Sequence, residues 1–273
     1  MVERMLAQGH TVTVWNRTAA KAAALQPAGA RVAASVREAV ASADRVHIAV
    51  ADDAVVDALL RDVVAGRRRD AIIVDHSTTL PAATRVRVEQ LTSAGVRFLH
   101  APVFMSPQMC RDGKGLMMVS GDADLFATVQ PALARMTGDV WYVGARGDLA
   151  AAYKLFGNAM IFAINAGLSD ILAMANHLDV PASDAIGVFS RFNTSGAIPM
   201  RGQKMASADF SPTFELAMAR KDVRLMLESA GDLPLVVLPA LAARMDAVIA
   251  AGHGGHDMAA IAAPIVASTA RLR

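Results

Sequence analysis

The two halves of the chain have different hydrophobic patterns, and this difference limits the possible folds most strongly. In the first half, short runs rich in β-branched residues alternate with helical patterns, which is typical of an open, doubly wound, mostly parallel sheet with helices on both faces. We expect strands at Thr11–Trp15, Ala30–Val32, Arg45–Val50, Ala71–Asp75, Val96–Ala101, Leu116–Ser120 and Val140–Val143. We expect helices at Ala19–Leu25, Val36–Ala41, Ala54–Val64, Pro81–Ala94 and Asp122–Met136.

The strand pattern ends after Gly144. From Asp148 to about Leu178 the sequence predicts one uninterrupted helix. Roughly 30 helical residues span about 45 Å, which is long enough to run from one domain into the next. Prolines then separate further helices. We therefore predict two domains, an α/β domain over residues 1–147 and an all-helical domain over residues 148–273.

Composition narrows the function classes. A formal charge of +2, from 27 basic and 25 acidic residues, is too balanced to indicate a nucleic-acid or membrane surface. Cys110 is the only cysteine, which excludes an intramolecular disulfide and favours a reducing, cytoplasmic compartment. The first ten residues lack the apolar segment of a signal peptide, and every long apolar run is interrupted by polar residues, so we expect no membrane-spanning helix.

The segment VTVWNRT ends a predicted strand with Asn16, Arg17 and Thr18. In a doubly wound sheet, the end of the second strand meets the adenosine ribose of a dinucleotide, and an arginine there accommodates a 2′-phosphate. The uncharged Asn16 would not repel that phosphate, so the segment favours NADP(H) over NAD(H). The alternative is structural, with Thr18 capping the next helix and Arg17 solvated.

The segment DHSTT places Ser77 and Thr78 after another predicted strand. Ligands of open α/β sheets bind beyond the carboxyl ends of the strands, so these side chains are candidates for facing a nicotinamide ribose or a substrate. Val50 and Ala51 follow the preceding strand and are expected to line the same groove. Helix capping explains Ser77 and Thr78 equally well.

The segment AAYKLFGNAM lies in the long predicted helix. Lys154 and Asn158 are four residues apart and share one helical face among apolar neighbours. Burial lowers the pKa of a lysine, which makes its ammonium a usable acid near neutrality, and Asn158 is placed to orient a substrate hydroxyl. The alternative is a lysine whose stem is buried while its ammonium reaches solvent.

Lys221 and Asp222 lie side by side in another predicted helix. Adjacent helical residues do not face each other, so we expect no salt bridge between them. They are either solvated surface residues or part of a ligand site.

His253, His256 and Asp257 form a third group, in the glycine-rich segment GHGGHD. Metal binding is one interpretation of this group. We expect no metal site there, because the segment is glycine-rich and typical of a loop.

These segments, taken together and in order, resemble the β-hydroxyacid dehydrogenase family, which includes 3-hydroxyisobutyrate dehydrogenase and is related to 6-phosphogluconate dehydrogenase. The resemblance rests on VTVWNRT, VDHSTT, HAPVF, AAYKLFGNAM, FELAMARKDVRLML and GHGGHD. It implies a Rossmann-type domain that binds NADP, with NAD possible, and a helical domain for substrate binding and homo-oligomer formation. Lys154 would be the general acid or base acting on a small β-hydroxy acid or its semialdehyde, and Asn158 would hold the same oxygen. Lys221 and Asp222 would lie beside the nicotinamide.

The chain departs from the family pattern around its expected substrate pocket. Phe104 and Met105 stand where the family has small residues, and Ser106 is a candidate for a displaced substrate hydroxyl contact. Gly157 replaces an asparagine that many members carry. The bulky apolar residues keep an imine reductase as an alternative function, whereas Lys154 favours carbonyl chemistry.

The resemblance also implies a strand and a GxGxxG loop before Met1, where glycines let the backbone approach a pyrophosphate. In the usual order 3-2-1-4-5-6 this strand would lie between Thr11–Trp15 and Arg45–Val50. We therefore expect the printed chain to be an N-terminally shortened form. Because the printed chain lacks this phosphate-binding loop, a non-catalytic, dehydrogenase-like oligomerisation scaffold is a further alternative function.

Overall fold

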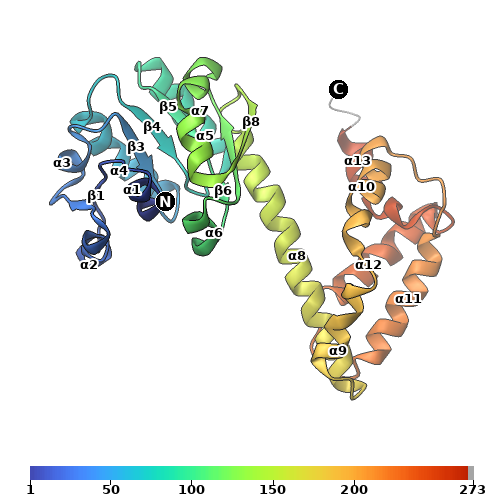
Figure 1. Cartoon of the computed structure of the whole chain (residues 1–273). Coiled ribbons are helices and arrows are strands. Elements are labelled where there is room, and N and C mark those ends of the chain that lie inside the picture. Colours follow the sequence, from blue (N-terminus) through green and yellow to red (C-terminus); the bar gives the residue numbers. More distant parts are fainter. Residues whose placement is uncertain (270–273) are drawn as a thin grey trace. The chain divides into compact units, whose positions relative to one another are not determined.

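The structure, a computed structural model, describes residues 1–269. The chain packs as two compact units, Met1–Asn158 and Ala159–Arg273, and each is described by itself. The first unit is the α/β part and the second contains helices (Figure 1). This arrangement confirms the fold class that the hydrophobic patterns predict.

The first unit contains two sheets. Strand β1 (Thr13–Val14) pairs in parallel with β2 (Arg31–Val32). The larger sheet holds β3 (Arg45–Ile48), β4 (Ile72–Asp75), β5 (Phe98–His100), β6 (Val103–Phe104), β7 (Leu116–Ser120) and β8 (Asp139–Gly144). Its order is β3-β4-β5-β7-β6, and β8 also pairs with β7. Among the described strands, β4 is the only partner of β3, so the two sheets are separate where the resemblance implies an intervening strand.

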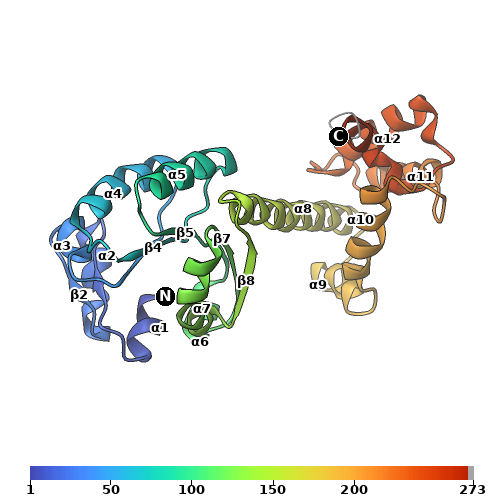
Figure 2. The ribbon, with the colours of Figure 1, turned by 90° about the horizontal axis from the view of Figure 1, so that it is seen from above.

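Helices cover both faces of the larger sheet, as a doubly wound fold requires. On one face, α3 (Val36–Val40), α4 (Asp53–Gly66) and α5 (Pro81–Ser93) pack in a core that includes Val56, Ile73 and Phe98. On the other face, α1 (Val2–Ala7) and α7 (Ala123–Thr137) pack in a core built around Leu99, Met117 and Leu133. Figure 2 shows these two layers on opposite sides of the strands. The first unit also contains the short helices α2 (Ala19–Ala23) and α6 (Pro107–Asp112).

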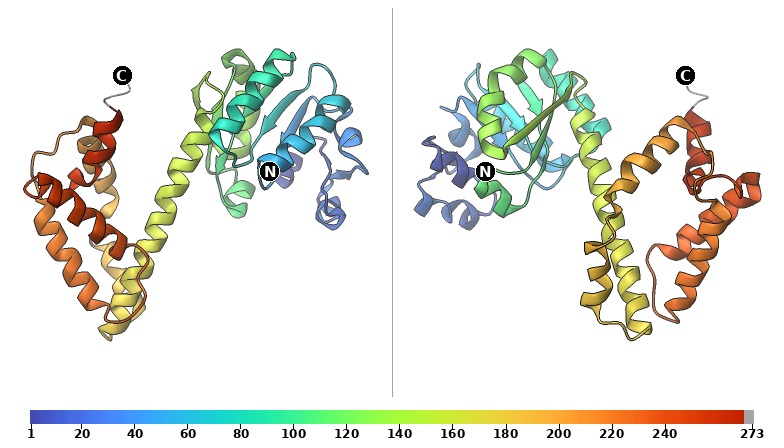
Figure 3. Two further views of the ribbon diagram at one scale, coloured as in Figure 1. Left: turned by 180° about the vertical axis from the view of Figure 1, so that it is seen from behind. Right: turned by 45° about the vertical axis from the view of Figure 1, so that its right-hand side comes forward.

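Helix α8 (Leu149–His177) begins in the first unit and continues into the second, and its 29 residues confirm the predicted long helix. The second unit contains α9 (Ala182–Gly187), α10 (Ala197–Ser207), α11 (Leu216–Ser229), α12 (Leu238–Val248) and α13 (Ala263–Thr269), which Figure 3 shows from two sides. Helices α11 and α12 form its core through Leu216, Val223 and Met245.

Asp170 fixes the start of α12 against α8. Its buried carboxylate accepts the backbone N–H groups of Val236, Val237 and Leu238, the last two at 2.9 Å. Burial alone would raise the pKa of Asp170, but these bonds lower it below the usual value. A single carboxylate thus satisfies three backbone donors at a helix start, which would otherwise have no partner within the helix.

Several details differ from the sequence-based predictions. Strand β6 and helix α6 were not predicted. They contain only two and six residues, which is too short for a periodic pattern of apolar residues. Strand β7 runs antiparallel to β5 and β6, a direction that a buried apolar run does not encode. Among residues 1–269, α8 is the one helix that is long and apolar enough to cross a membrane, judged by length and composition alone.

Candidate functional site

Asn16, Arg17 and Thr18 follow the carboxyl end of β1 and are exposed. The Asn16 side-chain oxygen accepts the Thr18 backbone N–H at 2.9 Å, which fixes the turn. Thr18 occupies the N-cap position of α2, yet its side chain makes no capping bond there. Among the described residues the Arg17 guanidinium forms no ion pair. The turn therefore presents a free arginine and a free hydroxyl beside the strand end.

The loops after β3 and β4 meet at the same edge of the sheet, because these strands are parallel and in register. The Val50 backbone N–H donates to Ser77 Oγ at 3.0 Å, so Ser77 is buried and joins the two loops. Thr78 and Ala51 are exposed beside that bond. The structure thus places the predicted cofactor residues of both loops together, with Ser77 in a supporting position and Thr78 exposed.

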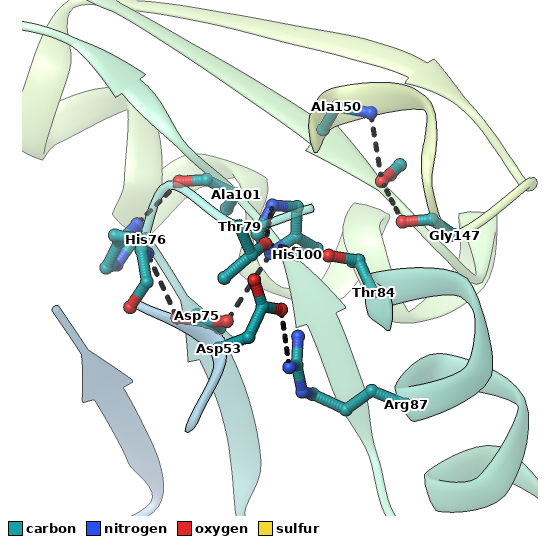
Figure 4. Close-up of polar contacts among 12 residues, drawn as sticks. Asp53, Asp75, His76, Thr79, Thr84, Arg87, His100, Ala101, Gly147 and Ala150 are labelled. Carbon is teal, nitrogen blue, oxygen red and sulfur yellow. Dashed lines mark hydrogen bonds and ion pairs between the residues drawn. The ribbon is translucent and has the colours of Figure 1, made fainter. Parts of the chain in front are cut away.

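A buried polar network that the sequence did not reveal lies behind these loops (Figure 4). His100 Nδ1 lies 3.5 Å from Asp75 Oδ2, and both side chains are fully buried. Burial would raise the pKa of Asp75, but the His100 contact and the bonds from Ser77 lower it. His100 Nε2 also approaches Thr79 Oγ1, which bonds Thr84 Oγ1 at 2.7 Å. The network holds the loop after β4 against β5.

A second polar chain fastens three strands of the sheet together. Arg45 Nε lies 2.8 Å from His47 Nε2, His47 Nδ1 lies 2.8 Å from His76 Nε2, and His76 Nδ1 lies 2.7 Å from the Ala101 carbonyl. Arg45 donates and the Ala101 carbonyl accepts, so both histidines are assigned as neutral rings that donate from Nδ1. Burial lowers the pKa of His76 to about 4 and that of His47 well below its usual value, which agrees with this assignment.

The predicted catalytic lysine is half-buried near the start of α8. Lys154 Nζ donates to the Val103 backbone carbonyl at 2.7 Å and lies 4.0 Å from the centre of the Phe104 ring. Burial lowers the pKa of Lys154. Asn158 follows one turn later in the same helix and is also half-buried. The ammonium is therefore held at a defined place by β6 and does not extend freely into solvent.

The predicted substrate residues surround the end of β6. Phe104 and Met105 are partly buried. Ser106 is exposed at the N-cap of α6, where its Oγ accepts the Met109 backbone N–H at 3.2 Å. Ser106 therefore caps the start of α6. Its contact with a substrate stays a prediction.

Lys221 and Asp222 lie in the second unit, on α11. Their side chains form an ion pair at 3.0 Å, so the expectation of no salt bridge between them is wrong. Although the Cα–Cβ bonds of adjacent helical residues point in different directions, the long side chain of Lys221 lets its Nζ reach Asp222 Oδ1. Both side chains are more than 40% exposed, so the pair adds little stability.

His253 and His256 contact each other through their Nδ1 atoms at 2.8 Å. The neighbouring Asp257 is fully buried and binds Arg201 and Thr213. No group of three metal-binding side chains lies together within the described residues. Asp257 therefore has a structural role in the second unit.

The residues beyond β1, β3 and β4 fit an NADP-type dinucleotide. Arg17 is exposed without a protein partner among the described residues and suits a 2′-phosphate, and Asn16 adds no negative charge. The joined loops at Val50 and Ser77 present backbone and hydroxyl groups at the carboxyl edge of the sheet. These loops would border the remainder of the cofactor.

Two family models cover almost the whole chain. The NAD binding domain of 6-phosphogluconate dehydrogenase matches residues 1–144, and the NAD-binding domain of NADP-dependent 3-hydroxyisobutyrate dehydrogenase matches residues 149–265. The chain belongs to this β-hydroxyacid dehydrogenase-like family of NAD(P)-binding dehydrogenases and reductases. The cofactor class expected from the sequence is thereby confirmed.

Curated relatives and solved structures extend the comparison. The cytokine-like nuclear factor N-PAC of Aedes aegypti is 27% identical over 96% of this chain, and the human protein of that name is 28% identical over 83%. The chain spans only 48% and 42% of these two relatives. An imine reductase from Myxococcus stipitatus in complex with NADP+ has a TM-score of 0.87 at 24% identity, covering 95% of this chain and 93% of its own. A reductive aminase from Aspergillus terreus has a TM-score of 0.85 at 22% identity, covering 95% and 92%. These solved structures share the fold.

Proposed function

We propose that the protein is an NADP(H)-dependent oxidoreductase that interconverts a small carbonyl compound and its alcohol, with Lys154 as the proton donor and acceptor. The family resemblance favours a small β-hydroxy acid or its semialdehyde as the substrate class. The observation that carries the proposal is the half-buried ammonium of Lys154, held at 2.7 Å from the Val103 carbonyl and with a lowered pKa. Bound NADPH supplies the hydride for the carbonyl carbon.

The protein's own part in the reaction is positioning and proton transfer. As the carbonyl carbon becomes tetrahedral, the electron pair of its C=O bond moves onto oxygen, and Lys154 Nζ gives that oxygen a proton. Asn158, one turn along α8, holds the same oxygen. In the reverse direction, neutral Lys154 accepts the hydroxyl proton. Thr78 is proposed to contact the ribose at the nicotinamide end of the cofactor, and the role of Lys221 and Asp222 beside the nicotinamide stays a prediction from the family resemblance.

The proposal is tested by following NADPH consumption with purified protein and a panel of semialdehydes, ketones and imines. Turnover of a carbonyl compound that depends on Lys154 supports it. Turnover that survives the loss of Lys154 contradicts the assignment of the proton donor. Turnover of imines alone would favour the second candidate, an imine reductase, for which the apolar Phe104 ring beside the ammonium is the favouring observation.

We expect the Arg17→Ala variant to bind NADPH about 10- to 100-fold more weakly than the wild type, because a hydrogen-bonded contact to a charged group contributes about 1.5–3 kcal/mol. NADH binding should change little. Fluorescence titration with each cofactor measures both constants. The exposed Arg61 on α4 gives the matched control, Arg61→Ala, with unchanged binding of both. Equal weakening toward NADPH and NADH would contradict the assignment of Arg17 to the 2′-phosphate.

We also propose that the protein is a homo-oligomer, a dimer or tetramer, formed through α8. This helix carries exposed large apolar side chains, among them Phe162 at 67% and Ile164 at 52% exposure, an amount unusual for a monomer's surface. Light scattering is expected to give at least twice the 28.6 kDa chain mass, and Phe162→Glu to give a smaller assembly. Val86→Glu, at an equally apolar exposed site on α5, is the control. A wild-type monomer at micromolar concentration would contradict the proposal.

A non-catalytic scaffold is the alternative from another class. The curated relatives carry the name of a nuclear factor, which says nothing of catalysis. The lowered pKa of Lys154 speaks against this alternative, because a scaffold does not need a proton donor. Wild-type protein that binds NADPH but consumes none of it with any substrate of the panel would favour the scaffold. The protein is proposed to act in the cytoplasm on a small molecule, without nucleic-acid or membrane contacts.

A further inference from the structure

The Phe104 ring is wedged between the ammonium of Lys154 and the backbone of Gly157. Lys154 Nζ lies 4.0 Å from the ring centre, within the range of a cation–π contact. Both Lys154 and Gly157 belong to α8, and Phe104 ends β6. Three residues from two elements thus form one contact group inside the first unit.

The Phe104 ring lies directly against the backbone of Gly157. A Cβ placed on Gly157 would collide with Cζ and Cε1 of the Phe104 ring, so the ring would have to shift. Glycine is unfavourable in the middle of a helix relative to alanine, so its presence there needs a reason. Gly167, ten residues later in α8, has no heavy atom within 4 Å of the same added Cβ. The ring contact gives a reason for glycine at position 157. Gly167, which lacks such a contact, serves as the control position for a substitution by alanine.

The ring also limits what the ammonium can bind. An ammonium has three N–H donors. One donates to the Val103 carbonyl, and the Phe104 ring covers another side, so few directions remain for a substrate. The proposed reaction assigns the remaining donor to the carbonyl oxygen, so a carboxylate elsewhere on the substrate would need a second cation. The two residues that follow the ring supply no cation, because Met105 is apolar and Ser106 is uncharged. The Ser106 Oγ also accepts the backbone N–H of Met109 at the start of α6.

We propose that Phe104 and Gly157 together determine substrate specificity, selecting a carbonyl compound with an uncharged, apolar substituent that packs on the ring and disfavouring one that carries a carboxylate. This inference rests on the proposed function, since it takes Lys154 as the proton donor. It departs from the substrate class that the family resemblance favours, because it selects apolar carbonyl compounds over acid semialdehydes.

The test compares two aldehydes of equal chain length, butanal and succinic semialdehyde, which differ by the terminal carboxylate. The wild type is expected to have at least a tenfold higher kcat/KM for butanal. Phe104→Ala, which uncovers the ammonium and removes the apolar surface, is expected to lower that preference at least tenfold while the NADPH dissociation constant stays within twofold. A wild-type preference for succinic semialdehyde, or a preference unchanged in Phe104→Ala, would overturn the inference.

Thermal melting tests the contact group without any turnover. Gly157→Ala is expected to lower Tm by several degrees, and the double variant Phe104→Ala/Gly157→Ala to melt within about two degrees of Phe104→Ala alone, because the collision is gone. Gly167→Ala is expected to leave Tm unchanged or raised. An unchanged Tm for Gly157→Ala would contradict the close contact between the Phe104 ring and Gly157. It would also overturn the proposal that these two residues together determine substrate specificity.

The two proposals fail in different ways. Lys154-dependent reduction of succinic semialdehyde in preference to butanal overturns the specificity assignment and leaves the proposed function standing. Reduction that is unchanged in Lys154→Ala, or no reduction of either aldehyde, overturns the proposed function and the specificity assignment that rests on it.

Discussion

Replacing Lys154 by alanine is expected to lower kcat for carbonyl reduction by about 10²- to 10⁴-fold, the range that a positioned general acid contributes. The reason is geometric as well as electrostatic, since Nζ is fixed by the Val103 carbonyl and its pKa is lowered by burial. Stopped-flow measurement of NADPH consumption gives kcat directly. The exposed Lys114, between α6 and β7, supplies the control Lys114→Ala, for which kcat should be unchanged.

The same assignment predicts the pH dependence of reduction. The protonated form of Lys154 is the donor, so kcat should fall as the pH rises through the pKa of this lysine. Because burial lowers that pKa, the fall should begin below the ordinary lysine value of about 10.4. Lys154→Arg carries a permanent charge and should lose this descending limb. A kcat of Lys154→Ala equal to that of the wild type, with the limb retained, would contradict the account.

The second large effect concerns the stability of the second unit. Asp257→Ala is expected to destabilise it by about 3–5 kcal/mol, the cost of breaking a buried ion pair by removing one partner. Asp257 is fully buried, and its carboxylate accepts from Arg201, from the Thr213 backbone and hydroxyl and from the backbone of Phe214 and Ala259. Urea unfolding measures the free energy. Glu228→Ala, which breaks an exposed pair with Arg224, should change it by less than about 1 kcal/mol.

Acid should remove the same contribution in the wild type. Burial alone would raise the pKa of Asp257, but its bonds from Ala259, Thr213 and Arg201 hold it well below the usual range. A lowered folded-state pKa contributes stability that is fully present above the unfolded value of about 3.9 and is lost as the pH falls below it. The urea midpoint of the wild type should therefore fall below pH 4 more steeply than that of Asp257→Asn. Parallel curves for the two proteins would contradict this role for Asp257.

Much of the fold was predictable because long periodic patterns specify it. The 29 residues of α8 and the alternation of strands and helices before it are set by repeated apolar positions, which depend little on the rest of the chain. The direction of β7 was not predictable, since an apolar run packs equally well in either direction. The ion pair of Lys221 with Asp222 was missed because backbone geometry was taken to fix the reach of a flexible side chain.

The sequence allowed candidate site residues to be proposed, whereas their contacts could not be predicted from it. Lys154, Asn158 and Arg17 stand at positions that local patterns mark. The contact of Phe104 with Lys154 joins residues 50 positions apart, and the Asp75–His100 network depends on strand pairing, so neither follows from spacing. The glycines of α8 gave no guide to this contact, because Gly157 lies against Phe104 whereas a Cβ added to Gly167 would meet no heavy atom within 4 Å.

The most direct test of the account is the fate of the hydride. The purified protein is incubated with butanal and NADPH carrying deuterium at the transferable C4 position, and the butanol formed is examined by mass spectrometry. We expect butanol with one deuterium on its carbinol carbon, formed at least 100-fold more slowly by Lys154→Ala. Unlabelled butanol, equal formation by the variant, or no reduction of either butanal or succinic semialdehyde would contradict the proposed hydride transfer.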